Sequence, residues 1–380
     1  MIYKKKHIVI FGSLRNVQED SRNNILIMSL EKLGWRLTRC IVNKGLASSS
    51  ASLGTKLLID LSCAPFRWLY LTIKYLFAPS HKIVYIPYPP HLDAWIVCIL
   101  SRLKNSKIII DSFMGLYDTI VRDRGLLREN GLLARCIWKY EELLLRSVDL
   151  ALVDTREHVH MLQHDYNLPN NRVAAIPVGI DEKLWKPVSY PADRNCFNVL
   201  LWTTFIPLHG VDVVARAAKL LEKEPENIFF TVIGRGQLER QFSKTLKTLR
   251  IINLKWIDQF LPLYEIQKYV QRSHCCLGVF GKQEKTKRVI PYKVYQTLAS
   301  SRPLITAKTP AIERVLSHTE NALFVHPGDH QELADAIKRL ANDRDLSLRI
   351  AKEGRKLYES QLSNQIITKQ LKEILKGIGI

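Results

Sequence analysis

Short apolar runs alternate with stretches of helical periodicity along this chain, and the alternation occurs twice. Runs rich in Val, Ile and Leu that end at turn residues are typical of buried strands in parallel sheets. In the first half we expect strands at His7–Phe11, Lys82–Ile86, Lys107–Ile110, Ala151–Asp154 and Val173–Val178. In the second half we expect them at Asn198–Trp202, Ile228–Gly234, Asn253–Ile257, Cys276–Phe280, Leu304–Ala307 and Ala322–Val325. Between them lie helix-period stretches such as Ile25–Leu33 and Trp138–Ser147.

This alternation predicts an α/β protein with two doubly wound parallel sheets. The pattern breaks from Trp185 to Arg194, where two prolines predict a linker. We therefore expect an N-terminal domain over residues 1–187 and a C-terminal domain over residues 188–362, which are ordinary domain sizes. Residues 363–380 form a last helical pattern with no strand after it.

The stretch from Arg288 to Ala299 is the most informative part of the sequence. Val289 and Ile290 precede Pro291, which opens a helical pattern, and an apolar strand pattern follows at Leu304. A helix N-terminus presents backbone N–H groups and the positive end of the helix dipole, and both favour an anion. The sequence thus predicts a site for a nucleotide diphosphate.

Two earlier turns have the same strand-to-helix setting. His209 and Gly210 follow the strand that ends at Trp202, and Gly234-Arg235-Gly236 follows the next strand. Glycine permits close backbone approach, and arginine binds phosphate with a bidentate fork. Each turn is also explained as plain chain geometry, so its position beside the Arg288–Ala299 stretch is what favours phosphate contact.

The loop from Gly281 to Arg288 carries four cations, including Lys285. A charge run is usually a solvated face. Directly before a predicted diphosphate site, however, the same cations raise the local affinity for anions and stabilise a phosphate leaving group. Both interpretations stay open from the sequence.

Taken in order, these motifs resemble the retaining family 4 of the GT-B glycosyltransferases, over about residues 7–360. The resemblance implies two Rossmann-like domains facing a central cleft, with the helix at 363–380 crossing back to the first domain. It implies a nucleotide-sugar donor held by the second domain, with Lys293 at the diphosphate and Gln296 at the ribose. It also places Gly12 near the donor.

The sequence departs from that family at three positions. The family pairs two glutamates eight positions apart, which here are Arg288 and Gln296. An amide offers one acceptor oxygen where a carboxylate offers two. Many members have a histidine after the strand that ends at Ile110, and this chain has Asp111. We expect catalytic contributions from Asp111, Arg288 and Lys293, although Asp111 is equally well explained as a helix cap.

The net charge of +20 is concentrated early, because residues 1–110 hold 16 Lys/Arg and 5 Asp/Glu, a net charge of +11. This bias indicates an anionic partner. Residues 57–77 are apolar but interrupted by charges, which argues against a membrane span. Their aromatic rings and cations suit a membrane interface, and a helix packed on the first sheet explains them equally well. Tyr88 and His91 are further candidates for acceptor contact.

The seven cysteines show no metal-ligand spacing, so we expect buried thiols in a reducing compartment. No signal-peptide pattern precedes His7, which predicts a cytoplasmic protein, peripheral at the membrane. The i, i+4 pair His160 and His164 lacks the glutamate of a zinc helix, and the D-x-D at Asp343–Asp345 lies in a polar helical segment. We therefore expect no metal or other cofactor.

Together these observations predict a glycosyltransferase that moves a sugar from a nucleotide-diphosphate donor to a saccharide or lipid-linked acceptor. Two alternatives remain: a nucleotide-sugar epimerase of the same architecture, and a catalytically silent nucleotide-sugar-binding subunit suggested by the missing glutamates. A nucleic-acid partner is not indicated, because the sequence shows no nucleic-acid-binding motif.

Overall fold

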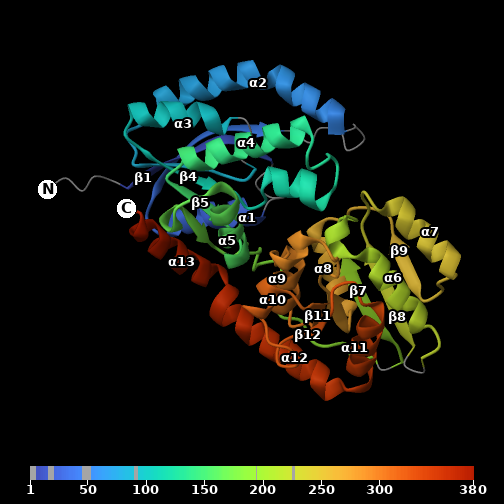
Figure 1. Ribbon diagram of the computed structural model, residues 1–380. Helices are drawn as coiled ribbons and strands as arrows, with labels where there is room; N and C mark the ends of the chain where they lie inside the picture. The colour runs from blue at the N-terminus through green and yellow to red at the C-terminus, as the bar shows by residue number, and fades with distance from the viewer. Residues whose placement is uncertain (1–5, 16–20, 45–52, 90–92, 194, 225–226) are drawn as a thin grey trace. The chain divides into compact units, whose positions relative to one another are not determined.

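The computed structural model describes residues 6–15, 21–44, 53–89, 93–193, 195–224 and 227–380. The chain divides into two compact units (Figure 1). The first comprises Met1–Thr119, Leu127–Gly179 and Asn364–Ile380, and the second comprises Ile120–Leu126 and Ile180–Ser363.

The first unit is built on a six-stranded sheet in the order β2-β1-β3-β4-β5-β6, with every strand pair parallel. Its strands are β1 (His7–Arg15), β2 (Arg36–Lys44), β3 (Ile83–Ile86), β4 (Lys107–Asp111), β5 (Leu150–Val153) and β6 (Val173–Ala175). All four residues of β3 and of β5 are buried. Parallel strands of this kind are covered by helices on both faces, which is why they read as continuous apolar runs.

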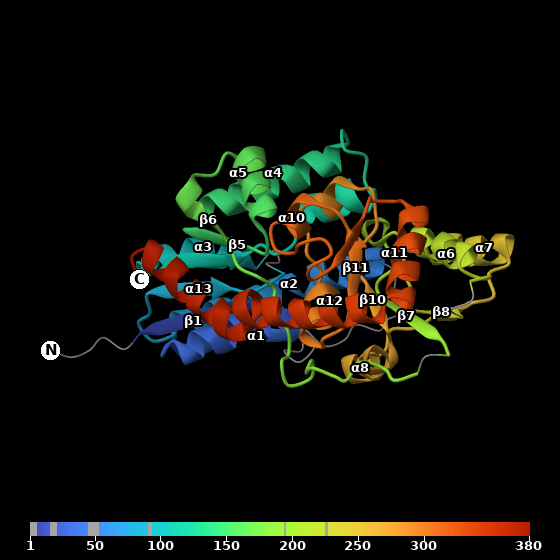
Figure 2. The same ribbon diagram turned by 90° about the horizontal axis from the view of Figure 1, so that it is seen from below.

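Helices cover both faces of this sheet, and each face has its own apolar core. One core takes residues from α2 (Leu53–Leu76), α3 (Ala94–Leu103), α4 (Leu132–Ser147) and α5 (Arg156–Tyr166). The other takes residues from α1 (Ser21–Lys32) and α13 (Asn364–Gly377). Figures 1 and 2 both show α13 beside α1, and the Ser29 and Thr368 hydroxyls hydrogen bond at 2.9 Å.

The second unit repeats the plan with a parallel sheet in the order β12-β11-β10-β7-β8-β9. Its strands are β7 (Phe197–Trp202), β8 (Ile228–Ile233), β9 (Leu254–Ile257), β10 (Cys275–Leu277), β11 (Leu304–Ala307) and β12 (Leu323–Val325). Its helices are α6 (Val211–Leu220), α7 (Glu239–Leu249), α8 (Leu263–Arg272), α9 (Tyr292–Ala299), α10 (Pro310–Glu313), α11 (His330–Asn342) and α12 (Arg344–Leu357). Short turns η3 (Pro207–His209) and η4 (Glu284–Lys287) follow β7 and β10.

The strand order reverses once in each sheet, and these points are where open α/β sheets bind ligands. In the first unit the reversal lies between β1 and β3, and in the second it lies between β7 and β10. The loops that leave β7 and β10 therefore meet at the binding edge of the second sheet. The loop after β7 contains His209 and Gly210, and the loop after β10 contains the basic stretch from Gly281 to Arg288.

The prediction of two doubly wound parallel sheets is confirmed, and every strand expected from an apolar run is present. The pattern missed β2, an edge strand in which Arg36 and Arg39 interrupt the apolar residues. The chain divides after Gly179, whereas the prolines placed the boundary after Pro187. Residues Asn364–Ile380 belong to the first unit.

The cysteine prediction needs a correction. Cys40, Cys98, Cys275 and Cys276 are buried, but Cys63 and Cys136 are exposed on α2 and α4. Both lie on amphipathic helices, where a single small residue does not reveal which face it occupies. His160 and His164 are exposed, in line with their interpretation as surface residues.

The apolar side of α13 yields a prediction about stability. Leu371 is buried in the core shared with α1 and β1, so Leu371→Ala is expected to lower the free energy of unfolding by about 2–5 kcal/mol. Urea unfolding measures the change, with the exposed neighbour Lys372→Ala as the matched control. Equal stability of the two variants would contradict the docking of α13 on this core.

Candidate functional site

A buried lysine lies at the strand-order reversal of the second unit. Lys293, in the first turn of α9, points its ammonium group toward the ends of β7 and β10. Its Nζ donates to Thr203 Oγ1 at 2.8 Å, to His209 Nδ1 at 3.3 Å and to the carbonyl oxygen of Gly278 at 3.4 Å. All three acceptors are neutral. A buried ammonium held only by neutral groups is well suited to an incoming anion.

Burial determines the charge of this cluster. Desolvation lowers the pKa of Lys293 to about 7, because water no longer stabilises the ammonium form. Burial, and then the neighbouring Lys293, hold the pKa of His209 well below its ordinary value. His209 is therefore neutral, and its Nδ1 accepts a hydrogen bond from the Lys293 ammonium group. The positive charge of this cluster therefore comes from Lys293 and not from His209.

Two glycines allow the surrounding loops to approach one another closely. Gly210 has φ +62°, and a Cβ there would lie 2.6 Å from the Phe280 carbonyl carbon. Gly234 has φ +131°, and its Cβ would lie 1.8 Å from the Thr203 carbonyl oxygen. Both positions require glycine, because the backbone is left-handed and a neighbouring main chain fills the space.

Gln296 lies one helical turn beyond Lys293 and is also buried. Its Oε1 accepts a hydrogen bond from the Trp202 indole N–H at 3.1 Å. Sequence reasoning missed Trp202 and Thr203 as partners, because both sit at the end of an apolar strand. Their proximity to α9 arises only from the pairing of β7 with β10.

The basic loop before α9 is only partly a solvated surface. Lys285 and Thr286 are buried, and their turn η4 packs against η3, which carries His209. Lys287 is exposed and pairs with Glu284 at 2.6 Å. Arg288, Val289, Ile290 and Pro291 then lead into α9, with Val289 and Ile290 buried. The loop thus brings cations and backbone to the edge where Lys293 lies.

Arg235 has a less specialised environment. Its side chain is half-exposed, and its Nε lies 3.4 Å from Glu239 and 3.8 Å from Asp258. Exposed pairs of this kind contribute little and leave the guanidinium accessible. Arg235 follows Gly234 on the same sheet edge as Lys293, two strands from β10.

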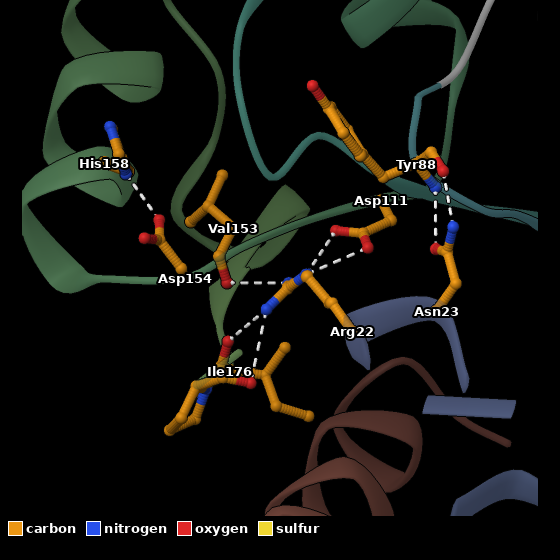
Figure 3. Close-up of polar contacts among 9 residues, drawn as sticks. Arg22, Asn23, Tyr88, Asp111, Val153, Asp154, His158 and Ile176 are labelled. Carbon is orange, nitrogen blue, oxygen red and sulfur yellow. Dashed lines mark hydrogen bonds and ion pairs between the residues drawn. The ribbon is translucent and has the colours of Figure 1, made fainter. Parts of the chain in front are cut away.

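The first-unit residue Asp111 is placed in a structural role. It is fully buried at the end of β4, and both carboxylate oxygens accept from Arg22 Nε, at 3.0 and 2.9 Å (Figure 3). Arg22 also donates to the carbonyl oxygens of Val153 and Ile176, which end β5 and follow β6. Burial by itself would lower the pKa of Arg22, but the Asp111 carboxylate outweighs it and holds that pKa above its ordinary value.

Near this pair, the ends of β1 and β3 carry further polar residues. Asn23 exchanges hydrogen bonds with the backbone of Tyr88 (Figure 3). Asp93 accepts from Ser13 Oγ at 2.6 Å, from Arg67 Nε at 2.8 Å and from Trp68 Nε1 at 3.0 Å. Gly12 lies in β1 with φ +124°. His91 falls outside the described residues.

The described residues contain no candidate metal-ligand cluster and no candidate membrane span. Across the described ranges, His, Cys, Asp and Glu side chains do not gather in groups of three that could hold a metal ion. Asp343 of the D-x-D segment caps α12 by accepting from the Leu346 N–H. None of the helices over the described residues has the length and apolarity that crossing a membrane requires.

Comparison with known proteins connects this geometry to one family. Residues 197–357 match the family model of glycosyl transferases group 1, which spans the strands and turns that surround Lys293. Over this region the chain is similar to the group 1 glycosyltransferases, and its two parallel sheets are those of the GT-B fold.

Relatives and solved structures agree with this assignment. The amylovoran biosynthesis glycosyltransferase AmsK of Erwinia amylovora is 23% identical over 212 residues, which cover 56% of this chain and 52% of AmsK. This chain thus spans about half the length of that relative. Sucrose-phosphate synthase from Thermosynechococcus elongatus has a similar fold, with a TM-score of 0.73, 16% identity and 98% coverage of both chains. Anabaena HepE, solved with UDP, has a TM-score of 0.68, 14% identity and coverage of 98% and 99%.

The Arg22–Asp111 pair yields a stability prediction. Asp111→Ala leaves a buried guanidinium without its counter-charge and is expected to cost about 3–5 kcal/mol of unfolding free energy. The double variant Arg22→Met/Asp111→Leu removes both charges and is expected to cost much less than the single change. Chemical denaturation measures both. Wild-type stability of Asp111→Ala would show that the pair is not structural and would restore Asp111 as a candidate base.

Lys293 yields a prediction about pH. An anion favours the ammonium form, so a nucleoside diphosphate is expected to bind the protonated site and to lose up to about tenfold in affinity for each pH unit above about 7. Calorimetric titration at several pH values measures this slope. Lys293→Met should bind weakly with no slope in this range, and the exposed-lysine control Lys244→Met should keep the wild-type slope. A pH-independent wild-type affinity would contradict the role of Lys293.

Proposed function

We propose that this chain transfers a sugar from a nucleotide-diphosphate donor to a saccharide or lipid-linked acceptor. The observation that carries the proposal is the buried Lys293 ammonium, held by neutral partners at the strand-order reversal of the second sheet. It lies inside the region that matches the group 1 glycosyltransferases. A second support is that neighbours of similar fold were solved with UDP or a UDP-sugar.

In this proposal different residues of the second unit bind the diphosphate and the ribose of the donor. Lys293, Arg288 and Lys285 neutralise the diphosphate, and the backbone from Val289 to Pro291 faces it. A diphosphate leaving group develops negative charge as the glycosidic bond breaks, and fixed cations stabilise that charge without reorganisation. Because protein cations perform this neutralisation, we propose that transfer proceeds without a bound metal, which a chelator added to the assay tests.

Other residues orient the donor. The Gln296 amide, fixed by Trp202, hydrogen bonds to the ribose. Gly210 and Gly234 let the diphosphate approach the backbone, with Arg235 as an outer cation. Gly12 lies within β1 of the first unit, and its contact with the donor stays a prediction from the family resemblance. We infer retention of anomeric configuration from the resemblance to the retaining family, and proton NMR of the first-formed product tests it.

We place the acceptor at the first unit and the protein on the cytoplasmic face of a membrane. The charge of +11 over residues 1–110 supports an anionic partner for this unit, as a lipid-linked acceptor in an anionic membrane would provide. Asp111 has no direct part in this proposal, because Arg22 occupies both of its oxygens. A silent nucleotide-binding subunit is the competing function, favoured by Arg288 and Gln296 at the two glutamate positions.

Nucleotide binding and turnover test the proposal separately. One of UDP, GDP or ADP is expected to raise the melting temperature, because a ligand that binds only the folded state stabilises it. Lys293→Met should lose this shift, and Lys244→Met should keep it. The matching sugar nucleotide should then be consumed when acceptor is added. Binding without consumption, across saccharide and lipid-linked acceptors, would establish the silent subunit, and the absence of any shift would overturn the donor site.

A further inference from the structure

Over its described side chains, which begin at residue 62, helix α2 is apolar on two opposite faces, and the sheet covers only one of them. Leu71 and Tyr75 are buried in the core of the first unit. The opposite face is exposed from Phe66, which is 80% exposed, to Phe77, which is 87% exposed. The exposed apolar residues follow helical spacing and are Phe66, Leu69, Tyr70, Ile73, Leu76 and Phe77. From residue 62 to residue 77, where the side chains are described, the segment both packs on the sheet and presents an exposed apolar face.

The neighbouring helix extends this surface. Figure 1 shows α3 beside α2 on the same side of the sheet, and the two helices are in contact. Ile99 and Leu103 of α3 are 66% and 74% exposed. Single exposed apolar residues are common on soluble proteins, but a continuous row on adjacent helices marks a docking surface.

A basic groove of about 650 Å³ runs between this face and the edge strand β2. Its lining includes Arg39 from β2, and Phe66, Arg67, Tyr70 and Lys74 from α2. Three of the described lining residues are cations, and the others are apolar or aromatic. The groove therefore combines positive charge with the start of the exposed apolar row.

The partners of these cations leave the groove positive. Arg67 is neutralised by Asp93 at 2.8 Å. Arg39 lies 3.6 Å from Glu31, but both side chains are about half-exposed, where ion pairs are weak. The Lys74 ammonium lies over the Tyr70 ring, 4.8 Å from its centre. An aromatic ring beside a lysine, at the border of an apolar face, is the combination that membrane interfaces favour.

We propose that this groove binds the phosphate of an anionic phospholipid headgroup while the row from Phe66 to Phe77 enters the membrane interface. Arg39 and Lys74 supply the charge, and the row supplies the apolar area. The inference deepens the proposed function, because it rests on peripheral association of the first unit with a membrane. A second copy of the chain fits the surface less well, since a two-fold contact would bring the same cations face to face.

Co-sedimentation with lipid vesicles tests the surface in the full chain. The protein is expected to pellet with vesicles of equimolar phosphatidylcholine and phosphatidylglycerol, and to stay in solution with phosphatidylcholine alone. Arg39→Glu/Lys74→Glu should weaken binding by at least about 30-fold, since each cation near an anionic surface contributes about tenfold or less and reversal adds repulsion. Phe66→Ser/Phe77→Ser should weaken it by at least about tenfold.

A matched control separates a site from general charge attraction. Lys369→Glu/Lys372→Glu makes the same change in net charge on exposed residues of α13, which packs on the other face of the sheet. It should bind anionic vesicles within about threefold of the wild type. An equal loss in both charge-reversed variants, or full binding by the phenylalanine variant, would overturn the proposal.

Two further measurements keep the test independent of folding and of the donor site. Phe77→Trp should show blue-shifted fluorescence and quenching by brominated lipid only with anionic vesicles, and unchanged fluorescence would overturn insertion. Every variant should keep the thermal shift that the nucleotide gives, because the donor cluster lies in the second unit. Absence of vesicle binding by the wild type, with that shift intact, overturns this inference and the membrane placement but leaves the donor site standing. Absence of the shift, with vesicle binding intact, overturns the donor site of the proposed function.

Discussion

A buried cation at the carboxyl edge of each sheet is the interaction on which much of this molecule depends. In the first unit Arg22 joins the ends of β4 and β5 to the segment after β6, and Asp111 neutralises it. In the second unit Lys293 joins α9 to the loops after β7 and β10, and its partners are neutral. The first cation stabilises the fold through its ion pair with Asp111. The second is held by neutral partners, so an anionic ligand can supply its counter-charge.

The two sheets could be predicted from the sequence, but the edge strand β2 and the buried Arg22–Asp111 pair could not. Strands covered by helices on both faces give continuous apolar runs, so the two sheets were predictable from pattern alone. The edge strand β2 is half-exposed and carries Arg36 and Arg39, and its pattern is correspondingly weak. Arg22 lies 89 positions from Asp111, in a helix whose sequence gives no sign that it is buried. Such a pair emerges only from the fold.

The candidate site was predictable to the extent that it follows local chain geometry. Strand-to-helix turns with glycine identified the loops around Gly210 and Gly234, and Pro291 identified the start of α9. The protonation of the cluster was not predictable, because it depends on desolvation at the meeting of several elements. Burial lowers the pKa of Lys293 to about 7 and holds that of His209 well below its ordinary value. The lysine is therefore the group that titrates near neutral pH, where a histidine would ordinarily be expected to titrate.

The carbonyl groups at the end of α2 have a hydrogen-bond donor within the protein and do not depend on water. The last carbonyl groups of a helix have no partners within it and normally bind water. Here the Lys104 ammonium, at the end of α3, donates to the carbonyl oxygens of Tyr75, Leu76 and Ala78. Withdrawing water from this end therefore leaves those three oxygens with the partner they already have. The helix terminus beside Phe77 keeps its backbone hydrogen bonding wherever the surrounding solvent is replaced by acyl chains.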